Sequence, residues 1–280
     1  MTSQRSGSAL RLLASVMLIT LGLGCASLPR PTYPLRDAGQ AIERRDASLA
    51  GVTAIRAEAR VDQRAKQGRI RGTVLMFVEN TGRVRFDVMT QFGPVAILTS
   101  DGAHFAFADF RENRYLTGET CPRNIERLLG VPLSAADTAH FLLGGTPVVV
   151  ADKRELRQRD DGSYTLVLHA TSGGRQELDL AVYPADLQKP AEQQRLYLLR
   201  SELISAAGAR VWRVTYEETE PLGQGADALL MPRRLRIEQP ASDSDTEVRF
   251  KEIAKNPRIP DDAFVQTPRA GMTQQEATCD

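Results

Sequence analysis

Apolar and polar residues alternate with a period of two through most of the chain, and this pattern predicts β-strands. The clearest run covers residues 83–88, where charged side chains alternate with Val84, Phe86 and Val88. One face of that strand should be wet and the other buried. Similar runs, separated by turns rich in Gly, Asp and Asn, predict strands at 52–62, 69–79, 95–100, 103–110, 114–117, 164–170, 175–182, 196–204, 210–217, 228–238 and 246–253.

Three segments have helical spacing instead. The first covers residues 35–49, and the second, 122–129, begins with Pro and precedes Gly130. The third covers 135–143, where Ser134 is a suitable N-cap and two glycines end the helix. About a dozen strands are too many for a flat sheet. We therefore predict a mainly β fold with α: a strongly curved antiparallel sheet that forms an open, incomplete β-barrel, with helices lidding its cavity.

The first 24 residues have the layout of an export signal. Arg5 and Arg11 precede an apolar run over 12–21 that is too short to span a bilayer. Cys25 follows Leu-Gly-Leu-Gly, which resembles the bacterial lipobox with Gly22 where Leu is usual. We expect cleavage before Cys25 and acylation of its thiol, so that the protein is anchored to a membrane by lipid. A plain signal peptide followed by a coincidental Cys is the alternative.

Ala26 is not the Asp that retains enteric lipoproteins in the inner membrane, so we expect an outer-membrane protein facing the periplasm. We divide the chain into a signal peptide (1–24), a Pro-rich tether (25–33), one domain (34–270) and a flexible tail (271–280). An oxidising periplasm would permit Cys121 and Cys279 to pair, but their spacing leaves a disulfide open.

The remaining composition narrows the function. Removing the two leader arginines leaves 34 of 36 basic residues against 35 acidic ones, a net charge of about −1 that suggests no nucleic-acid partner. His104, His140 and His169 are far apart and lack metal-ligand spacing, and no catalytic or phosphate-binding motif occurs. We therefore expect no catalytic residue, no metal site, no cofactor and no enzymatic activity.

Two stretches resemble outer-membrane lipoprotein receptors of the LolB type, whose fold is an open barrel half covered by helices. Residues 90–94, Thr-Gln-Phe-Gly-Pro, resemble the LolB loop that carries a protruding apolar residue, here Phe92 before Gly93. Residues 124–133 and 141–147 resemble the helix pair that lids the cavity. The resemblance implies a lid containing Leu128, Leu129, Phe141 and Leu142. The inward residues, which could line a lipid cavity or fill a solid core, are Val74, Met76, Val84, Phe86, Val88, Phe105 and Phe107.

The resemblance implies a monomeric protein that binds acyl chains and accepts acylated lipoproteins from a periplasmic LolA-like carrier, or inserts them into the outer membrane. Phe92 would contact lipid in this step; bending into the barrel mouth is its alternative. The competing interpretation is a non-catalytic envelope lipoprotein of the same fold, with a filled core and a role in interaction or assembly. A carrier of small lipids is a third hypothesis.

Overall fold

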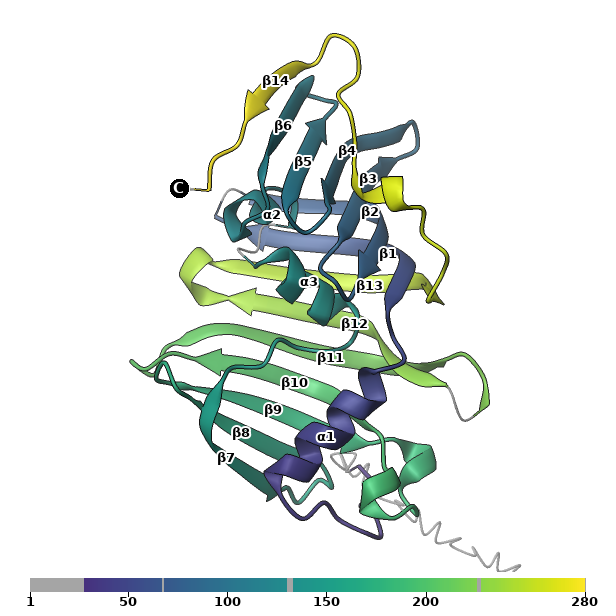
Figure 1. Cartoon of the computed structure of the whole chain (residues 1–280), viewed down its shortest axis with the longest axis vertical. Helices are drawn as coiled ribbons and strands as arrows, with labels where there is room; N and C mark the ends of the chain where they lie inside the picture. Colours follow the sequence, from purple (N-terminus) through teal and green to yellow (C-terminus); the bar gives the residue numbers. More distant parts are fainter. Residues whose placement is uncertain (1–27, 67, 130–132, 226–227, 280) are drawn as a thin grey trace, which may run out of the picture.

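The computed structural model describes residues 28–66, 68–129, 133–225 and 228–279. Within these ranges one curved, unclosed sheet contains fourteen strands (Figure 1). Its first half holds β1 (Ala54–Ala65), β2 (Gly68–Glu79), β3 (Val84–Thr90), β4 (Gly93–Ser100), β5 (His104–Asp109) and β6 (Arg114–Glu119). Its second half holds β7 (Ala151–Gln158), β8 (Tyr164–Ala170), β9 (Arg175–Val182), β10 (Leu196–Ile204), β11 (Arg210–Leu222), β12 (Leu229–Gln239) and β13 (Ser244–Lys255). The last strand is β14 (Thr273–Glu276).

The strand order is β14-β6-β5-β4-β3-β2-β1-β13-β12-β11-β10-β9-β8-β7. All neighbours are antiparallel except β14, which runs parallel to β6. Two meanders therefore join where β1 pairs with β13, and the edges of the sheet are β14 and β7. The mainly β, open-barrel prediction is confirmed, because the sheet curves without closing.

Three helices cover one face of this sheet: α1 (Ala38–Leu49), α2 (Pro122–Leu129) and α3 (Ala135–Leu142) (Figure 1). Ser134 caps α3 as expected, since its hydroxyl accepts a hydrogen bond from the Asp137 amide. Gly144, at φ +80°, ends the helix while Gly145 donates to the His140 carbonyl. None of the described helices is long and apolar enough to cross a membrane.

The register of the strands assembles the main core on the helix-covered face. Phe86 lies opposite Met76 on one side and Leu98 on the other, and Leu98 lies opposite Phe107. Residues directly opposite in neighbouring strands point to the same face, so these side chains form one apolar layer. The intervening positions point away from the helices. There Ala108 and Tyr115 form a second, smaller cluster with Met272 from the C-terminal segment.

The C-terminal residues differ from the flexible tail that we predicted for 271–280. Thr273–Glu276 pairs with β6, and a disulfide joins Cys121 to Cys279. Gly118 makes this possible, because an added Cβ would lie 2.2 Å from the Ala277 carbonyl oxygen. Close backbone approach at a glycine and a covalent bond between distant positions are not visible in spacing alone.

The described part of the predicted Pro-rich tether, residues 28–33, lies against the domain. The Arg30 guanidinium donates to the Asp160 carbonyl at 2.9 Å, and the Thr32 amide donates to the Leu187 carbonyl at 2.8 Å. The buried Leu35 amide donates to the Tyr164 hydroxyl. Residues 28–35, which we call the N-terminal strap, therefore cross the β7–β8 end of the sheet before α1 begins. Cys25 lies outside the described residues.

Candidate functional site

The predicted cavity residues do come together on the helix-covered face, but their side chains are packed. Six of them are less than 9% exposed and belong to one apolar cluster: Val74, Met76, Val84, Phe86, Phe105 and Phe107. Val88 is partly buried against the same cluster. Such exposures are those of core residues with neighbours on all sides. These residues of the first half of the sheet therefore form a packed core.

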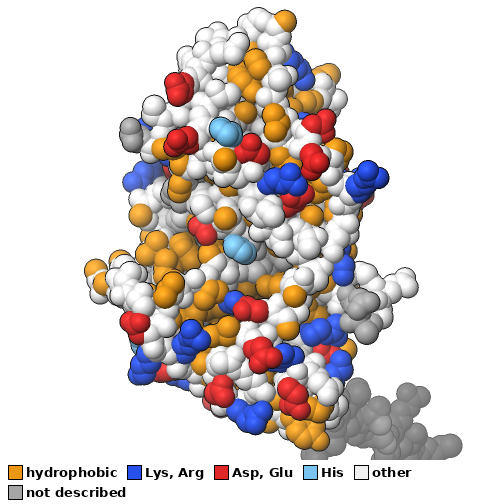
Figure 2. Space-filling view, in the orientation of Figure 1, with side chains coloured by type: hydrophobic (Ala, Val, Ile, Leu, Met, Phe, Trp, Pro, Cys, Tyr) orange, Lys and Arg blue, Asp and Glu red, His pale blue; other side chains and the backbone are white. Residues whose placement is uncertain are grey.

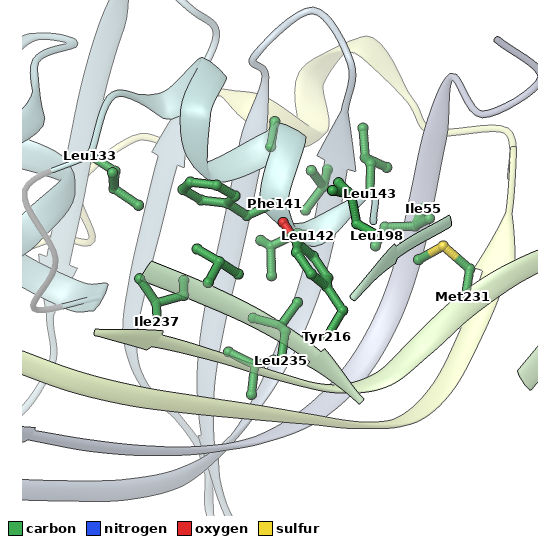
Figure 3. Packing of buried hydrophobic residues seen from close by; sticks show 14 of the residues in the cluster. Ile55, Leu133, Phe141, Leu142, Leu143, Leu198, Tyr216, Met231, Leu235 and Ile237 are labelled. Atoms are coloured by element: carbon green, nitrogen blue, oxygen red, sulfur yellow. The ribbon is translucent and has the colours of Figure 1, made fainter. Parts of the chain in front are cut away.

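Helix α3 lies over the junction of the two halves. Phe141 and Leu142 point from it toward β11 and β12, where Tyr216, Leu235 and Ile237 lie (Figure 3). The ring of Phe141 meets that of Trp212 edge to face, with centroids 5.2 Å apart. These two members of the predicted lid are thus buried contacts between a helix and the sheet. Leu128 and Leu129 lie in α2, but their side chains are outside the described residues.

The segment Gly144–Val150, which we call the connector, follows α3 and crosses the second half of the sheet. The buried Tyr216 hydroxyl donates to the Gly145 carbonyl, and burial raises the pKa of Tyr216 well above its ordinary value. The Gln176 side chain donates to the Pro147 carbonyl at 2.8 Å and accepts from the Val149 amide at 3.1 Å. A buried network of side chains therefore holds the connector above the apolar layer.

Apolar surface that remains open to solvent lies along the connector. Val148 is 41% exposed and Val150 is 77% exposed. Figure 2 shows apolar side chains in a hollow on this face, below α3 and beside α1. Leu156 and Leu203 lie on the same face, because they are opposite the inward Leu166 and Trp212, and both are only partly buried. The second half of the sheet thus has open apolar surface next to the connector.

A pocket of about 360 Å³ lies between α1, α3 and the connector. Its volume is at the lower end of the range for small-molecule sites. Apolar atoms of Leu49, Val52, Leu143 and Val148 form much of its wall, and Arg45 and His140 supply polar groups. An apolar wall with a few polar groups suits an acyl chain next to a polar linkage.

The Phe92 side chain is 91% exposed, so it does not bend into the barrel mouth. It lies in the two-residue turn between β3 and β4, because Thr90 pairs with Gly93. The Thr90 hydroxyl accepts from the Phe92 amide at 3.3 Å and donates to the Gly93 carbonyl at 2.9 Å. Gly93 has a φ of +111°, a conformation that L-residues rarely adopt. The turn therefore presents Phe92 to solvent from a fixed backbone.

Ion pairs, rather than apolar side chains, cover the other face of the second half. Arg200 lies between Asp179 and Glu202, and Glu202 also accepts from Arg213. Burial alone would raise the pKa of Glu202, but hydrogen bonds from Arg210 and Arg213 outweigh this effect and lower it. Among the described residues, no group of three or more His, Cys, Asp or Glu side chains is arranged to hold a metal ion.

This chain resembles known proteins in structure but not in sequence. No model of a known protein family matches the sequence, and no curated protein matches it. Among solved structures, a putative outer membrane lipoprotein-sorting protein domain from Vibrio parahaemolyticus matches with a TM-score of 0.51 and 13% identity, over 82% of this chain and 96% of that one. A LolA superfamily protein from Nitrosomonas europaea matches with a TM-score of 0.51 and 11% identity, over 83% and 99%. The chain has a LolA-like fold.

A third structure, a DUF1329 family protein from Desulfovibrio piger, matches this LolA-like fold equally well, with a TM-score of 0.51 and 13% identity over 81% of this chain and 95% of that one. At such identities the likeness concerns the fold alone. Sequence reasoning found the helix pair and the exposed turn, but it missed the connector. The connector is held by Gln176 and by Ser201, whose hydroxyl accepts a hydrogen bond from Thr146 at 2.9 Å. These two residues are 25 positions apart in sequence, and only the strand pairing brings them together.

Proposed function

We propose that this protein is an outer-membrane lipoprotein that binds acyl chains on the helix-covered face of its sheet, and that it accepts acylated lipoproteins at the outer membrane. The observation that carries the proposal is the open apolar surface along the connector, next to the 360 Å³ pocket. The sequence combines a predicted export signal and Cys25 with a domain that has a LolA-like fold. An acyl chain needs an apolar site with few directed polar groups, and this surface with its pocket meets that requirement.

Val148 and Val211 provide a matched test of where the chain binds. Val148 lines the pocket and is 41% exposed, whereas Val211 is 39% exposed. Val211 points to the other face, since the inward positions of β11 are Trp212 and Val214. The parent protein and both variants lack Cys25. A fluorescent fatty acid should bind Val148→Glu about tenfold more weakly than the parent, because a carboxylate replaces an apolar side chain in the pocket wall. Val211→Glu should bind like the parent.

Titration of the fluorescent fatty acid, together with native mass spectrometry, measures this difference. Equal loss of binding in the two variants would contradict binding at the connector. The packed core beneath α2 and α3 favours a second candidate function, which failure of the parent protein to bind any acyl chain would support. The protein would then be an envelope lipoprotein of the same fold that acts in interaction or assembly.

Phe92 is the residue that we propose contacts the acyl chain of a cargo lipoprotein during transfer. Phe92→Glu should fold normally, because the side chain it replaces is 91% exposed. It should nevertheless abolish transfer of an acylated lipoprotein into vesicles. Gln91→Glu places the same charge at the neighbouring exposed position and should transfer normally. Normal transfer by Phe92→Glu would show that contact of Phe92 with the acyl chain is not needed for transfer.

A further inference from the structure

The N-terminal strap and Phe92 lie at opposite ends of the molecule. The strap crosses the β7–β8 turn, at one edge of the sheet, while Phe92 lies between β3 and β4 near the other edge (Figure 1). The closest of these strands, β3 and β8, are eight positions apart in the strand order. Neighbouring strands are spaced about 4.8 Å apart, so the path along the curved sheet is about 38 Å.

The strap is attached closely to its end of the sheet. An added Cβ at Gly162, in the β7–β8 turn, would lie only 2.4 Å from the Leu28 carbonyl oxygen. Further along, the Gln194 side chain donates to the Tyr33 carbonyl at 2.8 Å, and Thr32 bonds to both Leu187 and Gln188. Backbone and side-chain contacts therefore fix the direction from which the chain enters the domain.

Only three residue steps separate Leu28 from Cys25. A fully extended chain covers at most about 3.6 Å per residue, so the lipid-bearing residue lies within about 11 Å of Leu28. The β3–β4 turn and the β7–β8 turn lie at opposite ends of the molecule (Figure 1), so this reach stays at the β7–β8 end. While the strap is docked, the membrane that holds the lipid of Cys25 must lie beside the β7–β8 end of the sheet.

We infer that Phe92 faces away from the membrane that anchors the protein and meets the acyl chain of a cargo lipoprotein that arrives from the aqueous phase. This inference rests on the proposed function, both on the acylation of Cys25 and on the contact of Phe92 with a cargo acyl chain, and adds the side of the molecule from which the cargo arrives. A Phe side chain fixed in water by its turn gains free energy only by contact with another apolar surface. The anchoring bilayer is beyond its reach, and an exposed acyl chain on an arriving protein supplies that surface. The docked strap thus makes the Phe92 end the receiving end.

Two tryptophan reporters measure this orientation in the full-length acylated protein. The chain has one Trp, so Phe92→Trp and Asp160→Trp are each combined with Trp212→Phe. Asp160 is fully exposed in the β7–β8 turn. The proteins are anchored in phosphatidylethanolamine–phosphatidylglycerol vesicles that contain a lipid with a nitroxide on its headgroup. Quenching should be at least twofold stronger for Asp160→Trp than for Phe92→Trp; equal or reversed quenching would overturn the orientation.

Gly162 and Gly208 supply the matched pair that tests the strap. Both lie in hairpin turns at positive φ, +88° and +79°, so alanine strains the two backbones similarly. Only at Gly162 would the new Cβ collide with the strap, since nothing lies within 4 Å of the position at Gly208. Gly162→Ala should remove the difference in quenching between the reporters, and Gly208→Ala should preserve it. An unchanged difference in Gly162→Ala would contradict orientation by the strap.

The partner is tested with the same Phe92→Trp reporter on nitroxide-free vesicles. A palmitoylated peptide added in solution should shift its emission to shorter wavelength, while the unacylated peptide should not. If neither peptide shifts the emission, or if only additional protein-free vesicles do so, the inferred partner is wrong. Because the quenching experiment involves no cargo, its failure is distinguishable from a failure of acyl-chain binding in the fatty-acid titration.

Discussion

The first and last described segments of the chain are held on opposite sides of the sheet by different chemistry. The C-terminal end is held by the disulfide between Cys121 and Cys279 and by the pairing of β14 with β6. The N-terminal strap is held without a covalent bond, by hydrogen bonds of which several reach the loop over residues 184–194, by an ion pair between Arg30 and Asp160, and by the buried Leu35 side chain. One attachment is covalent and the other is readily reversible. The end that we place at the membrane is thus the end that can detach without breaking a covalent bond.

A further difference concerns what each attachment fixes. Cys121 directly precedes α2, and the Asn124 side chain within α2 donates to the Glu119 carbonyl beside the disulfide. The C-terminal end therefore positions one of the helices that cover the sheet. The N-terminal strap leads into α1, which packs on β10 and β7. Reduction and acid should accordingly loosen different parts of the molecule.

The largest expected effect comes from removing the covalent attachment. Cys121→Ser with Cys279→Ser should lower the free energy of unfolding by about 4 to 5 kcal/mol, since the two cysteines are 158 positions apart and the disulfide closes a long loop. Urea unfolding of oxidised protein and of the double variant measures the change. Hydrogen exchange should show faster exchange in α2 and β14 but not in the strap. Faster exchange in the strap would mean that the two ends are coupled.

Acid should act on the opposite edge, through Asp186. This carboxylate is fully buried and accepts from the Arg195 side chain at 2.7 Å, within the loop that holds the strap. Burial would raise the pKa of Asp186, but hydrogen bonds from Arg195 and Lys189 outweigh it and lower the pKa. Its contribution to stability is therefore complete above the ordinary Asp pKa of about 4 and is lost as the pH falls through the lowered value.

Asp186→Asn tests this contribution. The variant should lose about 2 kcal/mol of unfolding free energy at pH 7, because charge-assisted hydrogen bonds to a buried carboxylate are lost. The difference from the wild type should shrink below about pH 4 as the wild-type carboxylate becomes protonated. Urea titrations between pH 7 and pH 3 measure it. A difference that stays constant over this range would mean that the charge of Asp186 contributes nothing.

The smallest expected effect comes from a variant that disrupts the pairing of β14 with β6 and keeps both cysteines. Gly118→Ala would place a Cβ 2.2 Å from the Ala277 carbonyl oxygen, whereas Gly72→Ala would place one 3.5 Å from a Val88 methyl group, an ordinary contact. Gly118→Ala should lower the free energy of unfolding by about 1 kcal/mol and expose β14 to exchange. Gly72→Ala should change neither. Protected β14 amides in Gly118→Ala would show that pairing does not need the glycine.

The strand rhythm predicted the two meanders because each inner strand has one apolar and one polar face. The pattern failed at both edges. In β7, Asp152, Lys153, Arg154 and Glu155 follow one another, and the strand was missed because little of it is buried. In β14, all four residues are polar and exposed. An edge strand has a neighbour on one side only, so its pairing leaves little trace in hydrophobicity.

The candidate site was predictable only where local chemistry decides it. The turn that carries Phe92 follows from Gly93 and Pro94, although the sequence left open whether the side chain protrudes or bends inward, and the α3 helix follows from its Ser134 cap and terminal glycines. The packed state of Phe86 and Met76 depends on how many neighbours the register brings to them, which alternation does not reveal. The open surface at Val148 and Val150 depends on side chains that meet only after the sheet has formed.

The edges that the sequence pattern missed carry a consequence for self-association. An unclosed sheet exposes strand edges that other chains could extend, which is a route to aggregation. Here β7 presents charged side chains along its length, and β14 is a four-residue polar strand. Each neighbouring copy that added a strand would have to desolvate those charges or pair with a very short ladder. The molecule can therefore leave its barrel unclosed without inviting polymerisation into fibres.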